Sequence, residues 1–142
     1  MLQLACLLAV TALGGCTYGA TAADTTGVVA AAVVIDVNLT SFADGYNPPV
    51  VTVPVGTRIQ FTNTDSFSHT ATSIAGTGFP DASPFDSSAV NASGSALSSA
   101  WGSGVLPAGG SSQVFVADQS GTYFYGCFFH YGHPMRGQIV VR

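Results

Sequence analysis

Short apolar segments rich in β-branched residues recur along the chain, and Gly, Pro, Asn and Asp separate them. Residues 57–63 alternate apolar and polar side chains with a period of two, which is the pattern of a half-buried strand. No segment keeps the 3.6-residue period of an amphipathic helix. We therefore predict an all-β sandwich or barrel. Its other predicted strands are residues 33–37, 50–53, 112–116, 122–125 and 138–141.

Residues 75–104 interrupt this pattern with a long stretch rich in Ser, Ala and Gly. The stretch contains Trp101, the only tryptophan of the chain. Its composition predicts a long surface loop inserted into the β domain, with a partner-binding element as the alternative.

The first fifteen residues are apolar and uncharged. This run is shorter than the roughly 18–20 residues that span a bilayer, so we predict a signal peptide over residues 1–15. The run leads into Cys16 in a sequence that resembles the lipobox of bacterial lipoproteins, whereas residues 20–22 (ATA) offer an ordinary cleavage site. A flexible tether over residues 16–27 and a folded domain over residues 28–142 would follow. The protein is thus expected in the periplasm or cell envelope, where a lipid on Cys16 would be its one link to the membrane.

Charged side chains are scarce in this protein. They make up 7% of the sequence, against roughly a quarter in an average soluble protein. The net charge of −4 argues against nucleic-acid binding, which needs a basic surface. Such a low charge density also gives little long-range steering toward any partner, and we expect a monomer.

Export changes how the three cysteines are interpreted. Cys6 would leave with the signal peptide, and Cys16 would be acylated or removed. Cys127 is then the only thiol of the folded domain, so it cannot form an intramolecular disulfide. It is either a reactive thiol or a metal ligand, and the neighbouring His and Met residues favour the ligand.

Soft metal ligands are concentrated near the C-terminus. Cys127, His130 and Met135 lie within nine residues, and His69 is a second imidazole far upstream. Two His, one Cys and a weakly bound Met are the ligand set of a blue-copper centre. We therefore predict one copper ion held by these four residues, with Cys127 at the end of a strand and Met135 at the start of the next.

The spacing Cys127-x2-His130-x4-Met135-x-Gly137 resembles the ligand loop of the plastocyanin and pseudoazurin branch of the cupredoxins. Residues 53–70 are similar to that family's segment around its first His ligand, and residues 118–125 to the strand before its Cys. The resemblance covers about residues 33–142. It implies a Greek-key β-sandwich of seven to eight strands and one type 1 copper ion that carries one electron at a time.

The chain departs from the family pattern at several positions. Gly126 precedes the Cys where plastocyanins have Tyr, and Thr70 replaces a common Asn, although its backbone N–H could still donate to the Cys127 sulfur. His133 fits no cupredoxin loop, so it could displace His130, add a ligand or lie on the rim of the site. The surrounding residues that could form an apolar docking patch are Phe128, Phe129, Tyr131 and Pro134.

We expect a single-electron shuttle between protein redox partners, and a copper carrier or chaperone with the same fold is the alternative. Multicopper oxidases and nitrite reductases need His pairs and a His beside the type 1 Cys. This chain has no His-x-His, and Gly126 precedes Cys127, so we expect no enzymatic activity.

Overall fold

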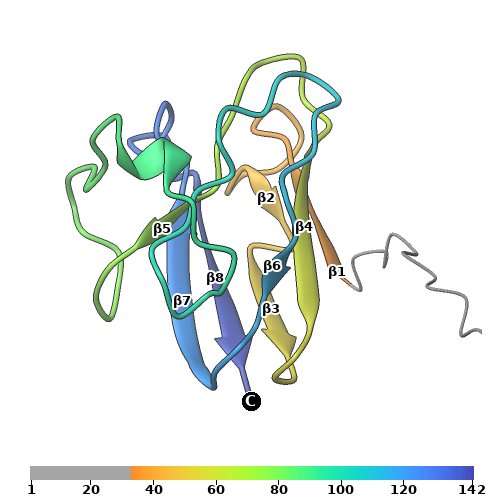
Figure 1. The fold of residues 1–142 in the computed structure, drawn as a ribbon. Helices are drawn as coiled ribbons and strands as arrows, with labels where there is room; N and C mark the ends of the chain where they lie inside the picture. Colours follow the sequence, from red (N-terminus) through yellow and green to blue (C-terminus); the bar gives the residue numbers. More distant parts are fainter. Residues whose placement is uncertain (1–32) are drawn as a thin grey trace, which may run out of the picture.

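The computed structural model describes residues 33–142, which form two four-stranded sheets packed face to face (Figure 1). The strand order is β2-β1-β4-β6 in one sheet and β3-β8-β7-β5 in the other. Both sheets are mixed, because β1 pairs with β4 and β3 with β8 in parallel, while all other neighbours are antiparallel. The strands are β1 (Val33–Val37), β2 (Tyr46–Asn47), β3 (Val50–Val53), β4 (Arg58–Asn63), β5 (Thr72–Ile74), β6 (Phe115–Val116), β7 (Gly121–Gly126) and β8 (Arg136–Val141). The predicted all-β sandwich of seven to eight strands is confirmed.

The period-two pattern of the sequence explains how each sheet buries one face. In β4, Ile59 and Phe61 are fully buried while their neighbours are partly exposed, and Ile139 and Val141 repeat this in β8. Successive strand residues point to opposite faces, so the apolar faces of both sheets meet in one core.

Three strands differ from the sequence prediction. The strand predicted at residues 112–116 is reduced to β6, because the hydroxyl of Ser112 accepts the backbone N–H of Phe61 in the place of a regular ladder bond. The short strands β2 and β5 were not predicted at all, since two or three residues are too few to show an alternation.

Residues 75–104 form a loop with one turn of 3-10 helix, η1 (Ala89–Asn91). The prediction that this loop lies on the surface is wrong for three of its apolar side chains, Val90, Leu97 and Trp101, which are buried. Trp101 is fully buried and Leu97 almost fully, and the indole stacks on Phe61 with 5.8 Å between ring centroids. The loop therefore completes the core instead of only covering it.

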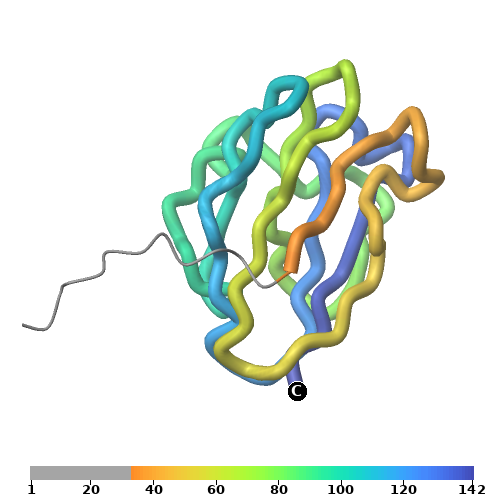
Figure 2. The backbone as a smooth tube through the Cα atoms, turned by 90° about the vertical axis from the view of Figure 1, so that its right-hand side faces the viewer, coloured from red at the N-terminus to blue at the C-terminus, as the bar shows by residue number. Residues whose placement is uncertain are grey.

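Three loops meet at the end of the sandwich that lies opposite the C-terminus (Figures 1 and 2). They follow β1 (residues 38–45), β4 (residues 64–71) and β7 (residues 127–135). The predicted signal peptide and tether, with Cys16, lie outside the described residues. Within residues 33–142, no helix has the length and apolar character needed to cross a membrane.

Candidate metal centre

Three of the four predicted ligands converge in the structure. The Nδ1 atoms of His69 and His130 lie 3.2 Å apart, and the Cys127 sulfur lies 3.5 Å from Nδ1 of His130 and 4.0 Å from Nδ1 of His69. His69 and Cys127 are fully buried, whereas His130 is partly exposed. Residues 61 positions apart in the sequence thus offer their donor atoms to one point.

His69 is held by backbone hydrogen bonds to a second loop and by a side chain at the end of β4, where its own loop starts. It forms a two-bond bridge with Leu106, through N–H to carbonyl distances of 3.1 and 2.8 Å. The Asn63 side chain donates to the carbonyls of Phe67 and Leu106 and accepts the N–H of Asp65. One buried amide therefore organises the turn that carries the first imidazole.

The other ligands lie on the hairpin of β7 and β8. Cys127 directly follows β7 and Met135 directly precedes β8, and the Cys127 N–H donates to the Met135 carbonyl over 3.1 Å. His130 lies in the turn between them. The predicted positions of Cys127 at a strand end and Met135 at a strand start are confirmed, so a paired ladder fixes the two sulfur-bearing residues.

Met135 is fully buried and packs against Gly45 of the β1–β2 loop. A Cβ atom placed on Gly45 would lie 2.5 Å from Cγ and 3.0 Å from Sδ of Met135. Gly45 also has a φ of 66°, a left-handed conformation that favours glycine. No sequence pattern predicts this contact, since Gly45 and Met135 are 90 residues apart.

Gly126, which departs from the plastocyanin pattern, makes room for Tyr131. A Cβ on Gly126 would come within 2.9 Å of the Tyr131 ring. Tyr131 is almost fully buried, and its hydroxyl donates a hydrogen bond to the Pro80 carbonyl. The Arg136 guanidinium carbon lies over the ring, 4.1 Å from its centroid. Tyr131 is therefore not part of an exposed docking patch, which corrects the prediction for this residue.

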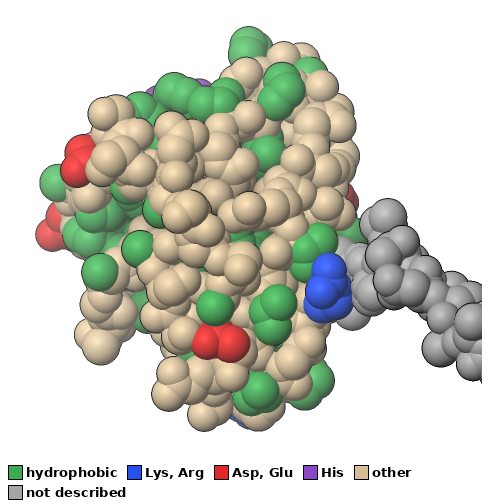
Figure 3. Space-filling model, in the orientation of Figure 1, with side chains coloured by type: hydrophobic (Ala, Val, Ile, Leu, Met, Phe, Trp, Pro, Cys, Tyr) green, Lys and Arg blue, Asp and Glu red, His purple; other side chains and the backbone are tan. Residues whose placement is uncertain are grey.

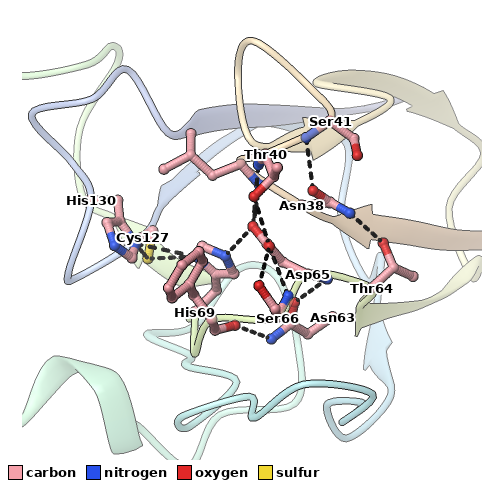
Figure 4. A network of polar contacts seen from close by, with 12 residues as sticks. Asn38, Thr40, Ser41, Asn63, Thr64, Asp65, Ser66, His69, Cys127 and His130 are labelled. Atoms are coloured by element: carbon pink, nitrogen blue, oxygen red, sulfur yellow. Dashed lines mark hydrogen bonds and ion pairs between the residues drawn. The ribbon is translucent and has the colours of Figure 1, made fainter.

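Hydrogen bonds orient the His69 imidazole and the Cys127 sulfur (Figure 4). The Thr70 N–H donates to the Cys127 sulfur over 3.4 Å, as predicted. Nε2 of His69 lies 3.0 Å from Oδ2 of Asp65, and because an ionised carboxylate only accepts hydrogen bonds, Nε2 carries the proton and Nδ1 is left with a free lone pair. Burial, with the neighbouring His69 and His133 imidazoles, lowers the pKa of His130, which favours its neutral, ligating form.

Tyr46 binds the backbone of Thr70, the residue that follows His69. Its fully buried hydroxyl donates to the Thr70 carbonyl over 2.6 Å, and burial, followed by the nearby Cys127 and Tyr125 side chains, raises the pKa of its phenol. The sequence analysis assigned no role to Tyr46 or Asp65. Tyr46 bonds to a residue 24 positions away, and Asp65 to Leu39, 26 positions away, so no local pattern indicates either contact.

His133 lies outside the converging group. It is exposed in the turn and its N–H donates to the His130 carbonyl over 2.9 Å. Among residues 33–142, the one cluster of three metal-binding side chains is made of His69, Cys127 and His130. Of the alternatives for His133, the structure fits the rim position best.

The donor atoms fit a metal ion by their spacing. Bonds of about 2.0 Å to nitrogen and about 2.3 Å to sulfur, arranged trigonally, would separate the donor atoms by about 3.5 Å (N to N) and about 3.7 Å (N to S). The observed separations of 3.2, 3.5 and 4.0 Å lie within a few tenths of an ångström of these values. A His2Cys plane with a nearby Met thioether suits copper.

A family model described as copper binding proteins of the plastocyanin/azurin family matches residues 31–142. The chain belongs to this family. This cupredoxin is therefore a copper protein, and its four residues His69, Cys127, His130 and Met135 are positioned for one type 1 copper ion. No curated protein sequence matches the chain.

Solved structures share the cupredoxin fold. A purple cupredoxin from Nitrosopumilus maritimus is 24% identical with a TM-score of 0.52, over 78% of this chain and 99% of its own. An auracyanin from Roseiflexus castenholzii is 23% identical with a TM-score of 0.52, over 80% and 98%. A copper-containing nitrite reductase from Thermus scotoductus is 22% identical with a TM-score of 0.52, but the match covers 78% of this chain and only 22% of that enzyme. The predicted Greek-key cupredoxin fold is confirmed.

Proposed function

We propose that this cupredoxin is a type 1 blue copper protein that carries single electrons between protein redox partners outside the cytoplasm. One observation carries the proposal: His69, Cys127 and His130 direct Nδ1, Sγ and Nδ1 to a common point, with every pair of atoms 3.2 to 4.0 Å apart. Family membership supports it, because the family binds copper.

We assign His69, Cys127 and His130 as the strong ligands and Met135 as the weak one. Copper bound by them would supply one-electron chemistry, taking an electron from a reduced partner as Cu(II) becomes Cu(I) and giving it to an oxidised one. The chain's own contribution is rigidity. The bridge at His69 and the bond from Cys127 N–H to the Met135 carbonyl hold the donors in place, so both oxidation states would meet nearly the same set of ligand positions.

Exposed apolar side chains form a rim around His130 at the same end of the molecule, and electrons would enter and leave the copper through this surface. The partly exposed His130 ring lies 6.2 Å from the ring of Phe129, which is 49% exposed. Phe67, two residues before His69, is 64% exposed, and Val105, directly before the bridged Leu106, is 51% exposed. Figure 3 shows histidine atoms beside hydrophobic side chains at the upper edge of the molecule. We propose this rim, and not the predicted patch with Tyr131, as the partner surface.

The proposal includes export and the division of the chain. A signal peptide over residues 1–15 and a tether over residues 16–27, with Cys16 as the lipid site, would hold the domain in the periplasm or at the cell envelope. The proposal also treats the protein as an electron carrier and not an enzyme.

Two histidine variants test the ligand assignment. We expect His130→Ala to remove the intense visible absorption of the Cu(II)-loaded protein, because it removes one equatorial donor. His133→Ala, in the same turn, is the control and should leave the absorption nearly unchanged, because His133 lies outside the cluster. The assignment fails if His133→Ala bleaches the protein and His130→Ala does not. Rapid loss of copper to a mild chelator would favour a copper carrier over an electron shuttle.

A further inference from the structure

The Asp65 carboxylate is a buried charge directly behind the first imidazole. Its residue is only 5% exposed, and Oδ2 lies 3.0 Å from Nε2 of His69 (Figure 4). Oδ2 also accepts the backbone N–H groups of Leu39 and Thr40, at 3.0 and 3.2 Å. Oδ1 accepts the Thr40 hydroxyl at 2.8 Å and the Ser66 N–H at 2.7 Å. Both oxygens are thus held from two loops, which fixes the direction of the carboxylate.

This carboxylate keeps its negative charge. Its two oxygens accept the backbone N–H groups of Leu39, Thr40 and Ser66 and the Thr40 hydroxyl, and hydrogen bonds donated to a carboxylate favour its ionised form. Its contact with His69 is a hydrogen bond from the neutral imidazole, and within residues 33–142 no Lys or Arg forms an ion pair with the carboxylate. The field of the carboxylate therefore falls mainly on the imidazole.

We propose that Asp65 is a positioning residue that lowers the reduction potential of the centre, by holding His69 as the Nε2–H tautomer and making Nδ1 a stronger donor. The proposal rests on the proposed function, in which Nδ1 of His69 binds copper. Carboxylate–histidine–metal arrangements fix the ring and raise the basicity of the ligand.

The direction of the effect follows from charge. Cu(II) carries one more positive charge than Cu(I), so a fixed negative charge behind a ligand stabilises Cu(II) more. Burial limits screening by salt and water, so the effect persists at physiological ionic strength. Removing such a partner typically weakens metal binding by about 10- to 100-fold. A tenfold loss confined to Cu(II) raises a one-electron potential by about 59 mV.

The test is the reduction potential of copper-loaded Asp65→Asn, measured by voltammetry. Asn keeps the size and an acceptor oxygen but removes the charge, so we expect a rise of about 59 mV or more, equal to at least a tenfold selective loss of Cu(II) binding. Asp44→Asn is the control, because Asp44 is an exposed carboxylate in the loop that also holds Leu39 and Thr40. A rise that is absent, or equal in the two variants, overturns the proposal.

Thr40→Val provides a second test that does not require Asp65 to be replaced. It removes the hydroxyl that donates a hydrogen bond to Oδ1. With one donor fewer, the negative charge of the carboxylate acts more strongly on the His69 imidazole. We expect the potential to fall in this variant, opposite to Asp65→Asn. A rise in Thr40→Val would contradict the account even if Asp65→Asn did not fold.

A copper-free measurement separates this inference from the proposed function. Nitrogen NMR of the copper-free protein should show His69 protonated at Nε2, and the Asp65→Asn variant should show a mixture of tautomers. If the wild-type protein stays colourless with Cu(II), the proposed function fails whatever the tautomer. If it turns blue and its potential does not respond to Asp65, only the inference fails.

Discussion

Thr70 joins the two halves of the metal centre at the level of a single residue. Its backbone N–H donates to the Cys127 sulfur, and its fully buried hydroxyl accepts the Phe128 N–H over 2.9 Å. The same hydroxyl lies 3.2 Å from that of Thr72. Thr70, directly after His69, therefore links the loop of His69 to the loop of His130 through Cys127 and Phe128.

We expect Thr70→Val to lower the free energy of unfolding of the copper-free protein by about 0.5–1.5 kcal/mol, because it removes the partly buried hydrogen bond that the Phe128 N–H donates to the Thr70 hydroxyl. Urea unfolding measures this change. Thr70→Ser keeps the hydroxyl and should stay closer to wild type. Equal stability of the Val and Ser variants would show that the hydrogen bond to Phe128 contributes nothing.

The candidate ligands, and the Thr70 N–H that donates to the Cys127 sulfur, could be predicted from the sequence, but the side chains that orient the ligands could not. Cys127, His130 and Met135 share one hairpin, so their spacing alone indicates that they lie together. Asp65 reaches Thr40 across 25 positions and Tyr46 reaches Thr70 across 24, so these contacts exist only after distant strands such as β1 and β4 have paired. Short-range patterns carry no information about such pairs.

At the scale of elements, the β1–β2 loop supports the whole centre. Thr40 holds Asp65, Gly45 lies against Met135, and Tyr46 at the start of β2 binds the Thr70 carbonyl. Thr40, Gly45 and Tyr46 are not themselves candidate ligands. The loop therefore positions ligands from two other segments, a role that its sequence does not reveal.

We expect Gly45→Ala to destabilise the protein more than Gly109→Ala. Both glycines have a left-handed φ, 66° and 75°, so both variants lose about 1–2 kcal/mol to backbone strain. A Cβ at Gly45 also strikes Met135 and adds about 1–3 kcal/mol, whereas one at Gly109 meets nothing within 4 Å. Urea unfolding compares the two.

The same pair of variants reports on the Met135 position. Only Gly45→Ala should change the visible spectrum of the copper-loaded protein, since only that variant displaces the Met135 side chain. Identical stabilities and spectra for the two variants would contradict a supporting role for the loop.

The long strands were predicted because each is a short run rich in β-branched or aromatic residues bounded by turn residues, and β4 also alternates apolar and polar side chains. The burial of Trp101 was not, because an indole within a Ser-, Ala- and Gly-rich stretch has no periodic neighbours. Its partners Phe61 and Phe115 come from other strands, so only tertiary packing decides that this loop enters the core.

At the scale of the whole molecule, the centre opens at an apolar end of a weakly charged protein. The net charge is −4 for 142 residues, and the rim residues Phe67, Val105 and Phe129 are uncharged. Electrostatic steering typically changes association rates by 10- to 1000-fold, and it falls steeply with salt. Docking at this end should depend on apolar contact instead.

Electron self-exchange between oxidised and reduced copies tests this view by NMR line broadening. We expect its rate to change by less than about tenfold between low and high salt, below the range seen with steering. Phe129→Asp should slow exchange by about tenfold or more, because it places like charges across the contact. Val55→Asp is the control, because Val55 is similarly exposed, at 52%, and lies near the C-terminus, at the other end of the sandwich. Equal slowing in both variants would place the contact elsewhere.

The absorption spectrum after addition of Cu(II) tests the central claim most directly. If His69, Cys127, His130 and Met135 form one type 1 site, the wild-type protein shows an intense visible thiolate-to-copper band, and Cys127→Ser loses it while it remains folded. A wild-type protein that binds Cu(II) and stays colourless would contradict the account.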